Sequence, residues 1–206
     1  MSANDVFVTG TDTNAGKTVL SALLCAALGY TYWKPIQTGT IEGSDREAVM
    51  KYAGIAEAQT VPEVYRFEPP LSPHLAASMA GVAIELDRIV RPSAAGPLVI
   101  EGAGGVLVPL NERDLMIDLM RRLDAAVLLA ARTSLGTINH TLLSVRALRS
   151  AGIGLKGVVM IGEPNEENRR AIERYGEVPV VGCIPPLPVI NRAVLIDVYA
   201  RCFDLR

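Results

Sequence analysis

The chain has 206 residues, of which 50% are hydrophobic and 20% charged, so it can bury the core of one large domain or at most two small ones. Its net charge of −2 gives no electrostatic reason to expect a nucleic acid or an anionic membrane as a partner. Cys25, Cys183 and Cys202 form neither a disulfide framework nor a paired metal spacing, which favours free, buried thiols. Residues 1–5 are polar and do not resemble a signal peptide, and no apolar run could span a bilayer. We therefore expect a soluble, cytoplasmic protein.

The first predicted elements are a short apolar strand at residues 6–8 and a glycine-rich turn that ends in Gly16-Lys17-Thr18. In such a turn the backbone N–H groups wrap phosphates, Lys17 reaches the terminal ones, and the Thr18 hydroxyl faces Mg²⁺. Five residues separate Gly10 from Gly16, where the usual pattern has four; counting from Thr11 restores the spacing but puts threonine in the first glycine position. A plain surface turn is the alternative. The strand before the turn and the helix after it favour a nucleotide-phosphate site.

Further along the chain, short apolar runs alternate with helical patterns. Continuous apolarity is typical of strands buried on both faces of a parallel sheet. The expected strands are residues 97–100, 126–131, 157–161 and 178–181, with 30–33 as a weaker candidate. The expected helices are residues 18–28 before Gly29, 136–151 before Gly152, and one capped by Asn165; an irregular or helical insertion begins at residue 69. This order predicts one domain with a doubly wound α/β sheet and its ligand beyond the carboxyl ends of the strands.

Three charged residues near predicted strand ends are candidates for the site. Glu101 follows the strand 97–100 and precedes the glycines of residues 102–105, so it could help to hold Mg²⁺; a solvated surface glutamate is the less favoured alternative. Lys34 precedes a proline, which favours an extended backbone, and it is either a second phosphate-stabilising lysine or a surface lysine. Asp45 could be a metal-linked carboxylate, but taken alone it is better explained as a helix cap.

The segment 134–140 leads into a helix whose free N–H groups could receive a carboxylate. His140, in the first turn of this helix, and His74 are both better explained as structural residues. Arg132 follows an apolar run and has no assignable role. No Ser/His/Asp or Cys/His arrangement can be recognised.

Taken together, these segments resemble the dethiobiotin synthetase family. The matching pieces, which keep the family's order, are Thr9-Gly10-Thr11-Asp12-Thr13 with Gly16-Lys17-Thr18, Lys34-Pro35 with Thr38-Gly39, Ser72-Pro73-His74, Glu101-Gly102-Ala103-Gly104-Gly105 and Gly136-Thr137-Ile138-Asn139-His140. The phosphate turn alone would be generic, whereas the ordered set is specific.

The resemblance implies a single domain, residues 1–206, with a doubly wound, mainly parallel sheet of the P-loop NTPase type. It implies an ATP-dependent ligase of biotin biosynthesis that closes a ureido ring on 7,8-diaminopelargonic acid. The diamine takes up CO₂ as a carbamate, the carbamate attacks the γ-phosphate of ATP, and the second amine displaces phosphate from the resulting carbamic-phosphoric anhydride. Mg²⁺ and a homodimer are also implied.

The resemblance further implies roles for individual residues. Lys17 and Lys34 are the expected catalytic residues, and Thr18, Asp45 and Glu101 the expected metal ligands. The expected nucleotide-binding residues are Asp12, Thr13, Asn14, Ala15, Gly16, Lys17, Thr18, Asp45, Glu101, Gly102, Gly104, Ile161, Gly162, Ile184 and Pro185. The expected substrate-binding residues are Thr13, Lys34, Thr38, Gly104, Gly136, Thr137, Ile138 and Asn139, of which residues 136–139 would receive the substrate carboxylate from the neighbouring subunit.

Two positions depart from the family pattern. Asn14 stands where many relatives have a glutamate, and Ile161-Gly162-Glu163-Pro164 replaces an Asn-Asp-like pair that helps to read adenine. The triphosphate is therefore better supported than the identity of the base.

Two rival functions remain for the same phosphate turn. A nucleotide-dependent switch of the partition or positioning type would carry an extra lysine where this turn has Thr11 and Asp12, and would offer a basic or amphipathic partner surface that the sequence lacks. A small-molecule kinase would leave a stable phosphorylated product instead of a ring.

Overall fold

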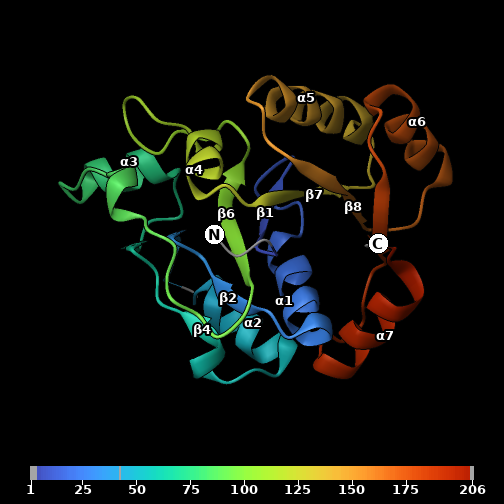
Figure 1. Cartoon of the computed structure of the whole chain (residues 1–206), viewed down its shortest axis with the longest axis horizontal. Helices are drawn as coiled ribbons and strands as arrows, with labels where there is room; N and C mark the ends of the chain where they lie inside the picture. The colour runs from blue at the N-terminus through green and yellow to red at the C-terminus, as the bar shows by residue number, and fades with distance from the viewer. Residues whose placement is uncertain (1–3, 42, 205–206) are drawn as a thin grey trace.

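The computed structural model describes residues 4–41 and 43–204, so residues 1–3 of the polar start lie outside the described part. Over these residues the chain forms one α/β domain around a seven-stranded, wholly parallel sheet (Figure 1). The strand order is β4-β2-β6-β1-β7-β8-β9. The strands are β1 (Val6–Gly10), β2 (Thr31–Trp33), β4 (Thr60–Val61), β6 (Leu98–Gly105), β7 (Ala126–Arg132), β8 (Leu155–Ile161) and β9 (Val180–Ile184). A separate parallel pair joins β3 (Ile36–Thr38) to β5 (Tyr65–Phe67). The predicted doubly wound α/β fold is confirmed.

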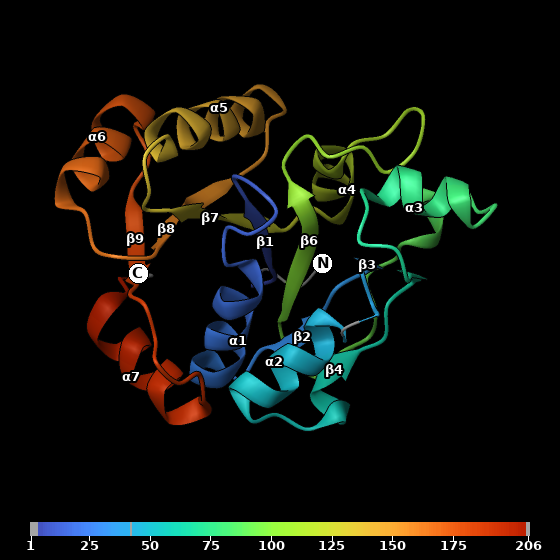
Figure 2. The same ribbon diagram turned by 180° about the vertical axis from the view of Figure 1, so that it is seen from behind.

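Helices cover both faces of the sheet (Figures 1 and 2). The helices are α1 (Lys17–Leu28), α2 (Asp45–Ala53), α3 (Pro73–Met79), α4 (Met116–Leu123), α5 (Thr137–Ser150), α6 (Glu166–Gly176) and α7 (Arg192–Cys202), with short 3₁₀ turns at Glu57–Gln59 and Leu86–Arg88. Side chains of α1, α2 and α7 share one buried cluster, and those of α3 to α6 share the other. Among the described helices, none has the length and apolar character needed to cross a bilayer.

The apolar runs of the sequence correspond to strands of the large sheet, with several changes of boundary; β1 extends to Gly10 and β8 begins at Leu155. β6 does not end at Ile100 but continues through Glu101 to Gly105, because it stays paired with β1 across a shift in register. β9 begins two residues later than the run 178–181 and ends at Ile184. Strands β3, β4 and β5 were not predicted, since two or three residues are too few to show a period.

The helix ends follow the capping signals, with one correction. Asn165 caps α6 by accepting a hydrogen bond from the N–H of Asn168, and Gly29 ends α1 in the left-handed conformation, as expected. The interpretation of Asp45 as a helix cap is wrong. Ser44 caps α2 in a reciprocal capping box with Glu47, and this leaves the Asp45 side chain free for other contacts.

The three cysteines are free thiols, as expected, but only Cys25 is buried, while Cys183 and Cys202 are half-buried. Burial raises the pKa of Cys25 to about 12, so this thiol stays protonated within α1.

Candidate active site

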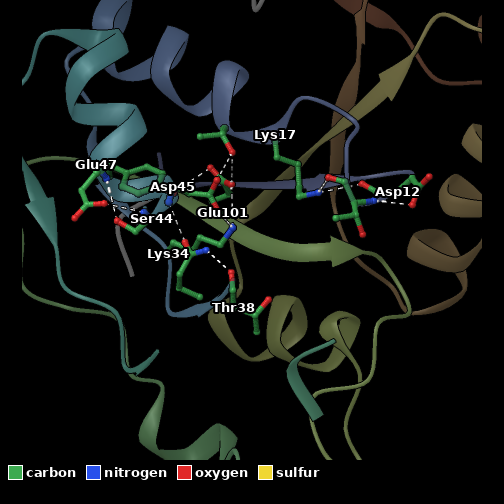
Figure 3. Close-up of polar contacts among 12 residues, drawn as sticks. Asp12, Lys17, Lys34, Thr38, Ser44, Asp45, Glu47 and Glu101 are labelled. Atoms are coloured by element: carbon green, nitrogen blue, oxygen red, sulfur yellow. Dashed lines mark hydrogen bonds and ion pairs between the residues drawn. The ribbon is translucent and has the colours of Figure 1, made fainter. Parts of the chain in front are cut away.

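Four segments that are distant in sequence meet at the carboxyl edge of the sheet (Figure 3). The phosphate turn follows β1 and supplies Thr18, whose Oγ1 lies 2.8 Å from Asp45 Oδ1 and 3.0 Å from Glu101 Oε1. Lys34 arrives from the end of β2, and Asp45 opens α2. The phosphate turn and the acid of the later glycine cluster thus share one site, as the sequence predicted.

Lys34 is buried between the two carboxylates. Its Nζ forms a short ion pair with Asp45 Oδ2 and lies 3.2 Å from Glu101 Oε1 (Figure 3). Burial opposes the charge on this ammonium group, but Glu101 and Asp45 outweigh it and raise the pKa of Lys34. Burial likewise acts to raise the pKa of Asp45, and the neighbouring Lys34 outweighs it and lowers that pKa. Both groups are therefore charged at neutral pH.

Thr18, Asp45 and Glu101 form a donor set that suits Mg²⁺. All three offer oxygen atoms, which this ion prefers, and the buried ammonium of Lys34 already stands as a cation between the two acids. Within the described residues no group of three or more His, Cys, Asp or Glu side chains could hold a metal alone. Mg²⁺ usually takes most of its ligands from substrate phosphates and water, with one or two carboxylates from the protein.

The phosphate turn is shaped by Gly16 and Lys17. Gly16 has φ +88° and caps α1, and a Cβ at this position would lie 2.7 Å from the Ile161 side chain, so only glycine fits both the conformation and the space. Lys17 Nζ donates to the carbonyl oxygens of Asp12 at 3.0 Å and Thr13 at 2.8 Å. Burial lowers the pKa of Lys17 to about 8. This ammonium is poorly solvated and would gain from an anion placed in the turn.

Arg132, for which the sequence suggested no role, forms an ion pair with the phosphate turn. Its guanidinium at the end of β7 lies 2.6 Å from Asp12 Oδ2, while Asp12 Oδ1 accepts a hydrogen bond from the Thr13 N–H at 2.7 Å. Both ion-pair partners are about half exposed, so the contribution to folding stability is small. The pair ties the start of the turn to the neighbouring strand.

Two adjoining cavities open at this edge of the sheet. The phosphate-side cavity has a volume of about 420 Å³ and the larger cavity about 700 Å³. Both are lined by Thr13, Gln37, Thr38, Asp45, Ala48, Tyr52, Ala103 and Gly104; the phosphate-side cavity adds Asn14, Gly16, Lys17, Thr18, Val19, Lys34 and Glu101. A polyphosphate and a second substrate could therefore lie next to each other.

Several predicted site residues lie outside the lining of these two cavities. Gly102 faces the core, where a Cβ would lie 2.9 Å from the Phe7 ring. Ile161, Gly162, Ile184 and Pro185 lie at the ends of β8 and β9, where the Gly162 N–H donates to the Ile184 carbonyl oxygen at 2.9 Å. Gly136, Thr137, Ile138 and Asn139 form the N-terminal turn of α5, and Ala15 is buried beneath the phosphate turn.

The sequence did not identify Tyr32, Gln37 or Tyr52 as site residues. Gln37 links the segment after Lys34 to α2, since its Oε1 accepts from the Asp45 N–H at 3.1 Å and its Nε2 donates to the Thr38 carbonyl oxygen at 2.7 Å. The sequence around Gln37 gives no sign of this contact, because the contact depends on where the start of α2 lies in the fold.

The comparisons agree with this arrangement. Residues 4–194 match the family described as AAA domain. Among solved structures, a ParA family ATPase from Chlorobium tepidum TLS superimposes with a TM-score of 0.59 at 11% identity, covering 98% of this chain and 94% of that one. A chain of the MinC:MinD cell division protein complex of Aquifex aeolicus gives a TM-score of 0.56 at 14% identity, covering 90% of this chain and 83% of that one. The fold and the phosphate turn therefore define a nucleotide-binding protein of the P-loop class.

Sequence relatives narrow this class. The ATP-dependent dethiobiotin synthetase of Rhodopseudomonas palustris is 48% identical over 97% of this chain and 93% of that protein, and the one of Agrobacterium fabrum is 46% identical over 96% and 93%. The chain belongs to the family of ATP-dependent dethiobiotin synthetases, the ligases of biotin biosynthesis that form carbon–nitrogen bonds. The alternative of a partition-type switch is not favoured, because those relatives share the fold alone.

Proposed function

We propose that this chain closes the ureido ring of dethiobiotin from 7,8-diaminopelargonic acid, CO₂ and ATP. The observation that carries the proposal is the cluster of Thr18, Lys34, Asp45 and Glu101 beside the phosphate turn and next to a cavity of about 700 Å³. One amine of the substrate forms a carbamate with CO₂, and a carbamate oxygen attacks the γ-phosphorus as ADP leaves. The second amine then attacks the carbonyl carbon of the anhydride and displaces phosphate, which closes the ring.

The side chains required for this sequence are mainly cationic. The diamine supplies both nucleophiles, so positioning and electrostatic stabilisation matter more than a covalent residue. The Lys17 Nζ now donates to the carbonyl oxygens of Asp12 and Thr13 within the turn. When ATP binds, it would exchange these two contacts for contacts with the β- and γ-phosphates. Lys34 lines the phosphate-side cavity and pairs with the two carboxylates, and there it could stabilise charge on the carbamate and on the transferring phosphoryl group.

We assign Thr18, Asp45 and Glu101 as the residues that would hold Mg²⁺. When bound, this ion would neutralise charge on the phosphate oxygens. The Thr18 hydroxyl lies within hydrogen-bond distance of both acids, which supports a shared ion at this point.

The remaining substrate contacts follow from the cavity lining. Thr13, Thr38 and the backbone at Gly104 line the larger cavity and would contact the diamine and the carbamate. The first turn of α5, residues 136–139, would receive the carboxylate of substrate bound to a second copy of the chain, within a homodimer in the cytoplasm. Leu107, Leu135 and Leu143 support such an interface, since these leucines near that turn are 56%, 105% and 56% exposed.

The activity test measures phosphate release from ATP by the purified protein. We expect release only when the diamine and bicarbonate are both present, together with formation of a ring product. Equal hydrolysis without the diamine would contradict the ligase and favour a nucleotide switch. A stable phosphorylated diamine as the end product would instead identify a kinase.

A further inference from the structure

Tyr32 lies directly behind the carboxylate of Glu101. It belongs to β2, its side chain is fully buried, and its hydroxyl lies 3.1 Å from Glu101 Oε2. The other carboxylate oxygen, Oε1, lies 3.0 Å from Thr18 Oγ1 and 3.2 Å from Lys34 Nζ. The two oxygens of Glu101 therefore have separate partners, one in the core and one in the site.

The alternation of β2 explains this position. Tyr32 and Trp33 point to opposite faces of the sheet, so Tyr32 packs in the cluster of α1 and α2 and Trp33 in the opposite cluster. β2 runs beside β6, with Tyr32 paired to Val99 and Trp33 to Ile100, which brings the phenol ring near the next residues of β6. From this position the Tyr32 hydroxyl donates a hydrogen bond to Glu101 Oε2.

A buried carboxylate oxygen needs a hydrogen-bond donor. The Glu101 side chain is fully buried, and leaving one of its oxygens without a partner costs free energy. Among the described residues, Tyr32 supplies the hydrogen bond to Oε2. Without this bond the carboxylate could rotate about its last torsion, which is a soft one.

We propose that Tyr32 is a positioning residue for the metal site, because its hydroxyl holds Glu101 Oε2 and thereby directs Oε1 toward Thr18 and Lys34. This inference rests on the metal site of the proposed function. It assigns to Tyr32 no contact with substrate or nucleotide. Its effect passes through the orientation of one carboxylate and should therefore be seen first in metal affinity.

The test measures Mn²⁺ binding to the Tyr32→Phe variant in the presence of ADP. The electron paramagnetic resonance signal of free Mn²⁺ gives the amount that is not bound. A hydrogen bond to a charged group contributes about 1.5 kcal/mol or more, so the Mn²⁺ dissociation constant should rise about tenfold. ADP affinity without metal should stay within about twofold, and half-saturation of activity by Mg²⁺ should move upward by a similar factor to that for Mn²⁺. Trp33→Phe is the matched control, since it perturbs the same strand on the opposite face and should leave Mn²⁺ binding unchanged.

A double variant separates positioning from packing. If Tyr32 acts through the Glu101 charge, adding Tyr32→Phe to Glu101→Gln should change Mn²⁺ affinity far less than it does in the wild type. Three outcomes would each overturn the proposal. Tyr32→Phe could bind Mn²⁺ as tightly as the wild type does, it could lose affinity equally for Mn²⁺ and for metal-free ADP, or it could fail to fold. Wild-type protein that binds no Mn²⁺ with ADP would remove the metal site itself, whereas loss of ring closure with Mn²⁺ binding intact would count against the proposed reaction alone.

Discussion

Lys34 lies between Asp45 and Glu101, so its ammonium group and a divalent cation would compete for the same oxygens. The lysine would have to turn toward substrate when metal and nucleotide enter together. Metal binding and the release of a catalytic cation would then be coupled at a single residue. This coupling can be tested by removing the charge.

We predict that Lys34→Met lowers turnover about a hundredfold, the usual effect of removing one donor to a transition state. Divalent metal binding without nucleotide should tighten about tenfold, because the two acids lose their competing cation. The unliganded fold should lose up to about 3 kcal/mol, since a buried pair is broken, and Mg²⁺ should restore part of this loss. Calorimetric Mn²⁺ titration and thermal melting with and without Mg²⁺ measure these effects.

Lys156→Met provides the control, because Lys156 is an exposed lysine of β8 and its removal should change none of the three quantities. Weaker or unchanged metal binding in Lys34→Met would show that the lysine and the ion do not share a position.

At the level of single residues, the sequence indicated several of the side chains that the structure brings together, although their roles stay predictions. Thr18 was placed by the phosphate turn, and Glu101 by its strand and glycines. Tyr32 escaped prediction, because a tyrosine in a buried strand looks like core until the partner across the sheet is known. The ambiguity at Asp45 had the same origin, since the helix cap at Ser44 became visible only in the fold.

Helix α2 is the element that brings an acid to the phosphate turn, and its start is fixed by a capping box. Ser44 accepts a hydrogen bond from the Glu47 N–H at 3.2 Å, and Glu47 Oε2 accepts one from the Ser44 N–H at 2.8 Å. Asp45 is the next residue and already makes contacts with Lys34 and Thr18. The local cap therefore sets the position of the Asp45 carboxylate.

We predict that Ser44→Ala destabilises the fold by about 1 kcal/mol, the usual loss for a helix cap, and also weakens Mn²⁺ binding in the presence of ADP severalfold. Asn165→Ala removes the cap of α6, a helix that contributes no residue to the cluster of Thr18, Asp45 and Glu101, and should reproduce the first effect without the second. Chemical denaturation and Mn²⁺ titration of both variants measure the difference. Equal metal affinities in the two variants would mean that the cap acts on stability alone.

Elements were predicted well where their length exceeded a few residues. The long buried strands and the helices α1, α5 and α6 were recognised from apolar runs and caps. β3, β4 and β5 are held by neighbours instead of by their own pattern, which explains why they were missed. The extension of β6 through its glycines depends on pairing with β1, a contact that a local reading does not contain.

For the molecule as a whole, the parallel sheet fixes the site, because the carboxyl ends of β1, β2 and β6 lie next to one another. That convergence was predictable from the order of strands and helices. The sequence also indicated the N-terminal turn of α5, residues 136–139, as a carboxylate site, and this turn lines neither of the two cavities of the same chain. In a dimer, these residues could bind the carboxylate of the substrate held by the second subunit.

A hollow of about 380 Å³ beside this turn adds a surface on which a second subunit could dock. It lies between the phosphate turn and α5 and is lined in part by Leu107, His140 and Leu143. Leu135 precedes α5 and is fully exposed. A single exposed leucine is ordinary, whereas several apolar side chains gathered around a hollow are typical of a contact surface.

We predict that Leu135→Asp converts a dimer to a monomer, because a charge placed in an apolar interface is left without a partner. Sedimentation velocity at micromolar concentration measures this change. The KM for the diamine should rise at least about tenfold with the KM for ATP nearly unchanged, since a contact to the carboxylate alone is lost. Val90→Asp is the control, as Val90 is 65% exposed and precedes Arg91, which pairs with Asp5 at the opposite edge of the sheet. A monomeric wild type, or a Leu135→Asp dimer with normal KM for the diamine, would show that each chain binds its substrate alone.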